Sequence, residues 1–178
     1  KDHIAGLDDV RAFNFLQMRD MPVYGSRATL GRVSEEFYYS FTKDPYPGVP
    51  RLTKIPFENS SFEIAGLTVI PILVMHHKMP VYGFRIGDFT YITDANYIAE
   101  EEREKIVGSK VLVLNALQKE GHLSHFTLPQ ALEVIGELGV PQAYLTHISH
   151  RLGLHASVET ELPVNVSLAY DGLTVEII

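Results

Sequence analysis

Histidine and aspartate are the residues of this sequence whose types and spacing could do chemistry. The chain contains eight histidines and no cysteine. Imidazole and carboxylate groups together bind zinc, manganese or iron in proteins. The lack of cysteine excludes a disulfide framework, a thiolate zinc site and a cysteine nucleophile. The histidines are His3, His76, His77, His122, His125, His147, His150 and His155.

Three of the polar residues come directly after strand-like runs of mostly apolar residues. These are His76, Asp94 and His147. Side chains at strand ends converge at one edge of a sheet, where functional sites are usually built. A single histidine at a strand end is more often an ordinary surface or hydrogen-bonded residue. Several at equivalent positions shift the balance toward a metal site, although spacing alone leaves both alternatives open.

Alternating helical and strand-like patterns supply the elements that must position these residues. Helices are predicted at 7–18, 26–39, 99–107 and 127–138, and strands at 22–24, 62–64, 67–75, 81–86, 89–93, 110–117 and 142–146. A hairpin is predicted over 165–178, because Asp171-Gly172 is typical of a type I′ turn. The charged run 100–105 is expected to be a solvated helix face. The pattern predicts one α/β domain with a mixed sheet over 1–178.

Composition limits the classes of partner. The chain has 178 residues, of which 46% are hydrophobic, which suits a single globular domain. Its net charge of -7 argues against a broad basic face for nucleic acid. No run approaches ~18 consecutive apolar residues, so no membrane span is expected.

Four segments resemble motifs of the metallo-β-lactamase superfamily, in the same order along the chain. Asp2-His3 and the residues up to 11 resemble the tail of its His-x-His-x-Asp-His motif. The other three segments are 74–76 ahead of Gly83-Phe84-Arg85, 91–96 with its Thr-Asp pair, and 145–150. Within the superfamily, the chain is most similar to the branch containing the phosphoribosyl cyclic phosphate phosphodiesterase of phosphonate breakdown. That branch has a Ser-His pair ahead of a helix, matched here by Ser124-His125.

The resemblance implies an αββα sandwich whose N-terminal strands are missing from this chain, and it implies a role for each matching residue. Asp2, His3 and His147 would hold the second of two metal ions, and Asp94 would bridge the two ions. His76 would belong to the first ion, together with the two histidines of His-x-His.

Those two histidines would lie just before Lys1. We therefore expect the natural chain to continue upstream, with a domain truncated at its N-terminus here. The alternative is a chain that cannot hold two metals in the family manner.

Other roles rest partly on the same resemblance. His125 is expected to act as the general acid or as a donor to the phosphate, because imidazole titrates near neutral pH. Asp2 is counted with His125 among the catalytic groups, and His150 is expected to contact the substrate or support a ligand. His77 could exchange with His76, since neighbours on a strand point to opposite faces and at most one is expected to be a ligand. His122 and His155 receive no role.

The predicted function is that of a metal-dependent hydrolase with a dinuclear zinc or manganese site. The expected substrate is a small cyclic phosphate or a nucleotide-like phosphodiester, cleaved by a metal-bridged hydroxide. Two alternatives stay open: a same-fold hydrolase of a thioester, lactone or tRNA precursor, and a non-catalytic binding module that lacks the first metal site. The expected partner is a small molecule rather than nucleic acid or membrane, a homodimer is left open, and a cytoplasmic location is expected.

Overall fold

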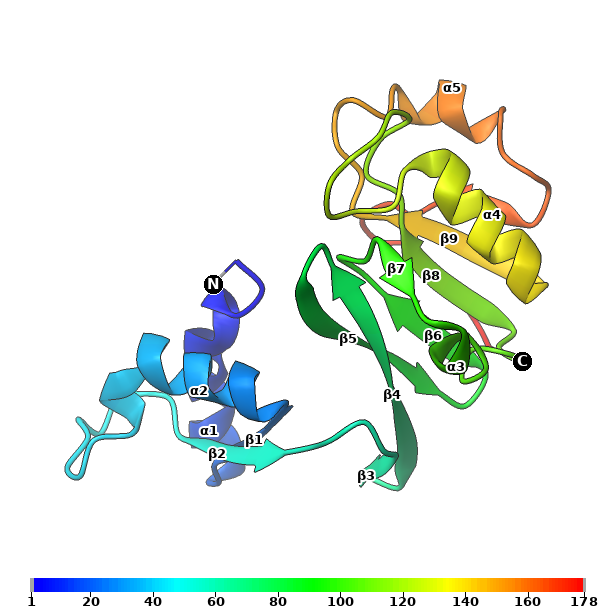
Figure 1. Cartoon of the computed structure of the whole chain (residues 1–178). Coiled ribbons are helices and arrows are strands. Elements are labelled where there is room, and N and C mark those ends of the chain that lie inside the picture. The colour runs from blue at the N-terminus through cyan, green and yellow to red at the C-terminus, as the bar shows by residue number, and fades with distance from the viewer. Residues whose placement is uncertain (1, 178) are drawn as a thin grey trace. The chain divides into compact units, whose positions relative to one another are not determined.

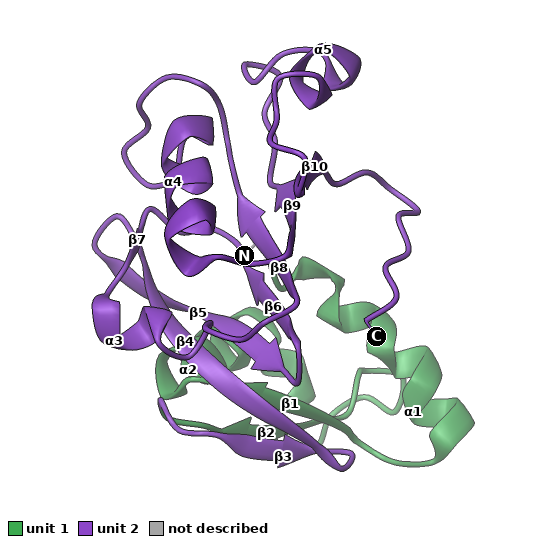
Figure 2. Ribbon diagram, turned by 90° about the vertical axis from the view of Figure 1, so that its right-hand side faces the viewer, with its two compact units in different colours: residues 1–58 green, residues 59–178 purple. Residues whose placement is uncertain are grey.

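The computed structural model describes residues 2–177, which belong to two compact units. The first unit is Lys1–Glu58 and the second is Asn59–Ile178 (Figure 2). Each unit has its own hydrophobic core and is described by itself. The expectation of one domain over 1–178 stays a prediction.

The first unit is a small α/β layer built on two parallel strands. Its elements are η1 (Ala5–Val10), α1 (Arg11–Gln17), β1 (Met21–Gly25), α2 (Arg27–Glu36), η2 (Tyr38–Ser40) and β2 (Leu52–Pro56). Strands β1 and β2 pair in parallel, as the crossover through α2 allows. Helix α2 begins where predicted, because the Ser26 side chain accepts a hydrogen bond from the backbone N–H of Thr29. The core of this unit centres on Val33, Phe37 and Leu52.

The second unit is a mixed sheet with helices beside it (Figure 1). Its strands are β3 (Phe62–Ile64), β4 (Leu67–His76), β5 (Met79–Ile86), β6 (Phe89–Ile92), β7 (Tyr97–Ile98), β8 (Val111–Asn115), β9 (Gln142–Thr146) and β10 (Val166–Leu168). The order is β10-β9-β8-β6-β5-β4-β3, and β7 pairs with β4. Strands β3 to β6 are antiparallel neighbours, whereas β6, β8, β9 and β10 run in parallel. The predicted mixed sheet is confirmed.

Helix α4 (Leu128–Leu138) covers the parallel part of this sheet (Figure 1). Its first turn is closed by a capping box, in which the Thr127 hydroxyl accepts from the N–H of Gln130 and the Gln130 side chain accepts in return from the N–H of Thr127. Gly139 ends the helix in the left-handed conformation, directly after the last residue of the predicted helix 127–138. The apolar face of α4 and the buried strand residues form the core of the unit, in which Leu112, Leu114 and Leu145 are fully buried.

Helices α3 (Glu100–Arg103) and α5 (His155–Glu159) are short. Helix α3 is shorter than the predicted 99–107, because the chain after it continues in turns. The Lys105 and Ile106 amides there bond three residues back, which is a tighter pattern than an α-helix.

The prediction of a solvated face over 100–105 is wrong for one residue. Glu102 is only 5% exposed. Its carboxylate accepts from the Asn59 side chain, from the backbone N–H of Leu73 on β4 and from Lys105 Nζ, at 2.6–2.8 Å. Burial raises the pKa of Glu102, but these hydrogen bonds outweigh it, so its pKa lies below the ordinary value.

The predicted hairpin over 165–178 is also wrong. The Asp171-Gly172 turn does form, and the N–H of Leu173 donates to the Tyr170 carbonyl at 3.0 Å. However, β10 pairs in parallel with β9, and residues 173–177 form no strand in the described chain. Asp-Gly fixes only the local turn, whereas a ladder also needs a neighbouring strand that presents a matching edge.

Candidate metal centre

The candidate site lies at one edge of the sheet in the second unit. His76 is the last residue of β4, Asp94 follows β6, and His147 follows β9 directly. Strands β4 and β6 are both antiparallel to β5, so they run in the same direction. Strand β9 also runs in this direction, because β6 is parallel to β8 and β8 is parallel to β9. Strands β4, β6 and β9 therefore end at the same edge of the sheet. His125, two residues ahead of the Thr127 cap of α4, comes from the adjoining loop. The topology therefore brings together residues that are far apart in sequence.

Asp94 lies at the centre of this group. Its Oδ1 atom is 3.0 Å from Nε2 of His125 and 3.1 Å from Nε2 of His147. Both distances are within hydrogen-bonding range, and a carboxylate oxygen is the acceptor in such a bond. The side chains of Asp94 and His125 are 15% and 11% exposed, while that of His147 is 33% exposed. The site is thus sheltered on the aspartate side and open on the His147 side.

The imidazole rings pack closely around His125. The His76 ring meets it edge-on, with centroids 4.7 Å apart, and the His147 ring stacks on it at 4.8 Å. Burial lowers the pKa of His125 more than the hydrogen bond to Asp94 raises it, and His147 and His76 lower it further. These surroundings favour neutral imidazole, which is the form that binds metal.

The residue types and their spacing fit a metal ion. One ligand atom from each of His76, Asp94 and His125 lies within 4.8 Å of the others. His147 shares the same carboxylate oxygen, so the set offers imidazole nitrogens and a carboxylate oxygen. Such ligands suit zinc or manganese. Sequence reasoning gave His125 only a catalytic or substrate-binding role, and the structure adds it to the group that could hold a metal.

The backbone is held in an unusual conformation at two of these positions. Asp94 has φ 54° and His147 has φ 57°, both in the left-handed region. For residues other than glycine this costs on the order of 1–3 kcal/mol, and such residues cluster at functional sites. Both residues sit where a strand ends and the chain turns away, so the left-handed step aims each side chain along the sheet edge.

The far side of the His125 ring has polar partners that sequence reasoning did not assign. Its Nδ1 atom lies 3.0 Å from the Ser124 hydroxyl and 3.1 Å from Nδ1 of His122. Nothing in the spacing of His122 pointed to this contact, because it depends on how the loop ahead of α4 folds back. Ser124 was noted only as part of the Ser124-His125 pair.

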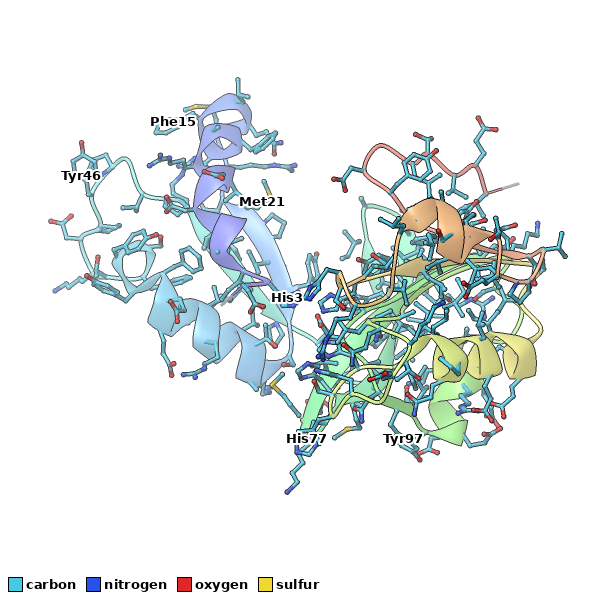
Figure 3. The ribbon with its side chains drawn as sticks, turned by 90° about the horizontal axis from the view of Figure 1, so that it is seen from above. His3, Phe15, Met21, Tyr46, His77 and Tyr97 are labelled. Atoms are coloured by element: carbon cyan, nitrogen blue, oxygen red, sulfur yellow. The ribbon has the colours of Figure 1, made fainter. Side chains whose placement is uncertain are left out.

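Asn96 joins two of the segments that carry the site. Its Oδ1 accepts from the backbone N–H of His77 at 2.7 Å, and its Nδ2 donates to the Leu123 carbonyl at 3.3 Å. His77 has φ 57° and lies exposed at the turn between β4 and β5 (Figure 3). The structure therefore places His76, rather than His77, beside Asp94.

The remaining predicted site residues are His150, Asp2 and His3. His150 is exposed in the loop after β9. Asp2 and His3 belong to the first unit, where His3 Nε2 lies 3.9 Å from Asp2 Oδ2 and both side chains are more than half exposed. The catalytic, substrate-binding and metal-ligand roles of these residues stay predictions.

Comparison with known proteins establishes the family. A family model described as a beta-lactamase superfamily domain matches residues 1–148. The chain therefore belongs to the β-lactamase superfamily, and the metallo-β-lactamase fold predicted from its motifs is confirmed.

Two solved structures are similar to this chain over nearly its whole length. A crystal structure described as a new diphosphatase from the PhnP family matches with a TM-score of 0.88 and 30% identity, covering 97% of this chain and 66% of the other. This match confirms the predicted likeness to the phosphodiesterase branch. The metallo-β-lactamase fold protein YhfI from Bacillus subtilis shares the fold, with a TM-score of 0.75, 20% identity and coverage of 97% of this chain and 72% of the other.

A curated relative is named for acyl transfer rather than for phosphate chemistry. An octanoyltransferase from Porphyromonas gingivalis is 37% identical over 174 residues, which is 97% of this chain and 35% of the relative. The chain thus spans about a third of that protein's length.

Within the described residues, no helix has both the length and the apolar character that a bilayer crossing requires.

Proposed function

We propose that this chain is a metal-dependent hydrolase that cleaves a small cyclic phosphate or a nucleotide-like phosphodiester. The observation that carries the proposal is the convergence of His76, His125 and His147 on Asp94 at one sheet edge. Three imidazoles around one carboxylate form a set of ligands that suits zinc or manganese. The backbone strain at Asp94 and His147 supports the same reading.

The ligand roles rest on position for one unit and on the family resemblance for the other. His76, Asp94 and His147 would hold metal, and Asp2 and His3 would complete the set as the family resemblance implies. When bound, divalent cations polarise a phosphoryl oxygen and lower the pKa of a water molecule toward neutrality. Because metal-bound imidazole is neutral, a site loaded with divalent cations would keep a net positive charge and favour an anionic substrate.

His125 is the residue that donates a hydrogen to the leaving group. Its Nε2 atom lies 3.0 Å from the Asp94 oxygen, so a hydrogen there is placed to be donated to a phosphate oxygen or, when the ring starts as imidazolium, to the leaving alkoxide. On the other side of the ring, the Ser124 hydroxyl can either donate to Nδ1 or accept from it. As a general acid, His125 would pass from imidazolium, with hydrogens on both ring nitrogens, to neutral imidazole, which keeps its Nδ1 hydrogen toward the Ser124 oxygen.

A phosphate substrate is favoured over other esters by one comparison. The diphosphatase relative matches 97% of this chain at 30% identity. Among phosphodiesters, the net charge of -7 disfavours RNA as the substrate, because RNA binding needs clustered positive charge.

A second candidate is hydrolysis of an acyl thioester. The observation in its favour is the 37% identity to a protein named octanoyltransferase. It is the weaker candidate, because 65% of that relative lies outside the match and can contain the named activity.

A substrate panel tests the proposal. The chain, loaded with Mn²⁺ or Zn²⁺, is assayed with bis-p-nitrophenyl phosphate, a cyclic nucleotide, a cyclic ribose phosphate and an octanoyl thioester. We expect turnover of at least one phosphodiester and its loss in Asp94→Asn. Turnover of the thioester alone supports the second candidate. A metal-loaded chain with no turnover at all supports a binding module and contradicts both hydrolase proposals.

A further inference from the structure

Asn115, the last residue of β8, is a fully buried polar residue bonded to the segment that carries Asp94. Its exposed fraction is 0%. Its Oδ1 accepts from the backbone N–H of Ala95 and its Nδ2 donates to the Ala95 carbonyl, both at 2.9 Å. From this geometry we infer that Asn115 is a positioning residue that fixes the Asp94 carboxylate at the metal centre. The inference rests on the metal centre of the proposed function.

Asp94 needs such a support because the sheet no longer holds it. Strand β6 ends at Ile92, so the ladder to β8 stops before Asp94. The next residue, Ala95, makes its backbone hydrogen bonds to the Asn115 side chain in place of a neighbouring strand. With φ 54° at Asp94, the chain is held in a conformation that few residues adopt unaided. The two bonds to Asn115 hold Ala95, the residue immediately after this strained one, at both its N–H and its carbonyl.

Ala95 also positions the segment of His125. Its carbonyl accepts a second hydrogen bond, from the N–H of Phe126, at 2.7 Å. Asn115 therefore orients a residue that directly follows Asp94 and is hydrogen-bonded to the segment of His125. A shift of Ala95 would move the carboxylate and the imidazole together.

A purely structural role for Asn115 predicts a loss of stability and nothing else. The chain offers a matched control on the same two strands. Thr90 on β6 and Ser109 just before β8 share a buried hydrogen bond of 2.7 Å between their hydroxyls, at the other end of this strand pair. Thr90→Val removes a buried side-chain hydrogen bond at a distance from the metal centre.

The test measures metal affinity and stability in the 178-residue chain. Zn²⁺ and Mn²⁺ are titrated by calorimetry into metal-free wild type, Asn115→Ala and Thr90→Val, at urea concentrations that leave each protein folded. We expect Asn115→Ala to weaken metal binding roughly 10–100-fold, as is usual for residues that orient a ligand. Thr90→Val is expected to lower the urea midpoint while leaving the metal Kd unchanged. Equal metal affinity in wild type and Asn115→Ala, or an equal loss in both variants, overturns the inference.

A wild-type measurement covers the case in which Asn115→Ala does not fold. Coupling between two sites is reciprocal, so if the Ala95–Asn115 bonds favour metal binding, bound metal must favour those bonds. Hydrogen exchange at the Ala95 amide should slow when Zn²⁺ is added, more than exchange at the Thr90 amide does. Unchanged exchange at Ala95 while metal binds contradicts the inference. A wild type that binds no metal contradicts the proposed function instead, which separates the two failures.

Discussion

The Nε2 atom of His147 lies 3.1 Å from the Oδ1 atom of Asp94, and both residues take the left-handed backbone conformation just after a strand, within two residues of its end. Two strained residues that follow different strands therefore meet side chain to side chain at the sheet edge. Such strained residues cluster at functional sites, and we propose that this pair holds a ligand.

Removing the central carboxylate should abolish metal binding without unfolding the protein. We expect Asp94→Asn to raise the metal Kd more than 100-fold, because it removes the charge that draws in the cation. Its stability without metal should stay near that of wild type, since Asn keeps the size of the side chain. Calorimetric titration and urea unfolding measure the two effects. Asp88→Asn, which breaks a surface ion pair with Lys110 on the same sheet, is the control and should keep its metal.

Replacing His125 should separate catalysis from metal binding. We expect His125→Ala to lose roughly 10²–10⁴-fold in phosphodiester turnover, the usual worth of a general acid. Metal content after dialysis should match wild type, because His76, Asp94 and His147 are intact. Unchanged turnover removes His125 from the mechanism, and a parallel loss of metal makes it a ligand instead of an acid.

His155→Ala provides the matched control for that experiment. His155 is an exposed histidine whose ring contacts Tyr170, at a centroid distance of 6.3 Å. Its replacement should change neither turnover nor metal content. A comparable loss in this variant would show that the effect of His125→Ala is not specific to the site.

Glu102 should govern part of the stability in acid. Its pKa is lowered in the folded chain, so its contribution is present above the unfolded-state pKa of about 4.3 and is lost as the pH falls through the lower folded-state value. At pH 7 we expect Glu102→Gln to cost about 2–4 kcal/mol of unfolding free energy, since it leaves Lys105 and Asn59 without their charged partner. Urea unfolding at pH 7 and pH 3 tests this.

The difference in unfolding free energy between wild type and Glu102→Gln should be smaller at pH 3 than at pH 7. Glu101→Gln is the matched control, because the Glu101 side chain is exposed on the same helix and should change stability by less than about 0.5 kcal/mol. A pH-independent difference for Glu102→Gln would show that the carboxylate charge contributes nothing.

The location of the site followed from the sequence, because strand ends are visible as breaks between apolar and polar runs. His76, Asp94 and His147 could be assigned to one sheet edge on that basis alone. The contacts made by Asn115 and His122 could not, since they depend on which strand lies beside which and on how a loop folds back. Glu102 was misjudged for the same reason: its run of charges is typical of a solvated helix, and only the neighbouring β4 backbone shows why one of them is buried.

Histidine NMR during a zinc titration tests most directly whether His76, Asp94 and His147 form a metal centre. Long-range ¹H–¹⁵N spectra of the imidazoles report each ring nitrogen separately. We predict that Zn²⁺ shifts a ring nitrogen of His76 and of His147 by many times the change at His150 and His155, and that Asp94→Asn removes this response. Zinc that binds while the ring nitrogens of His76 and His147 stay unshifted would contradict the account.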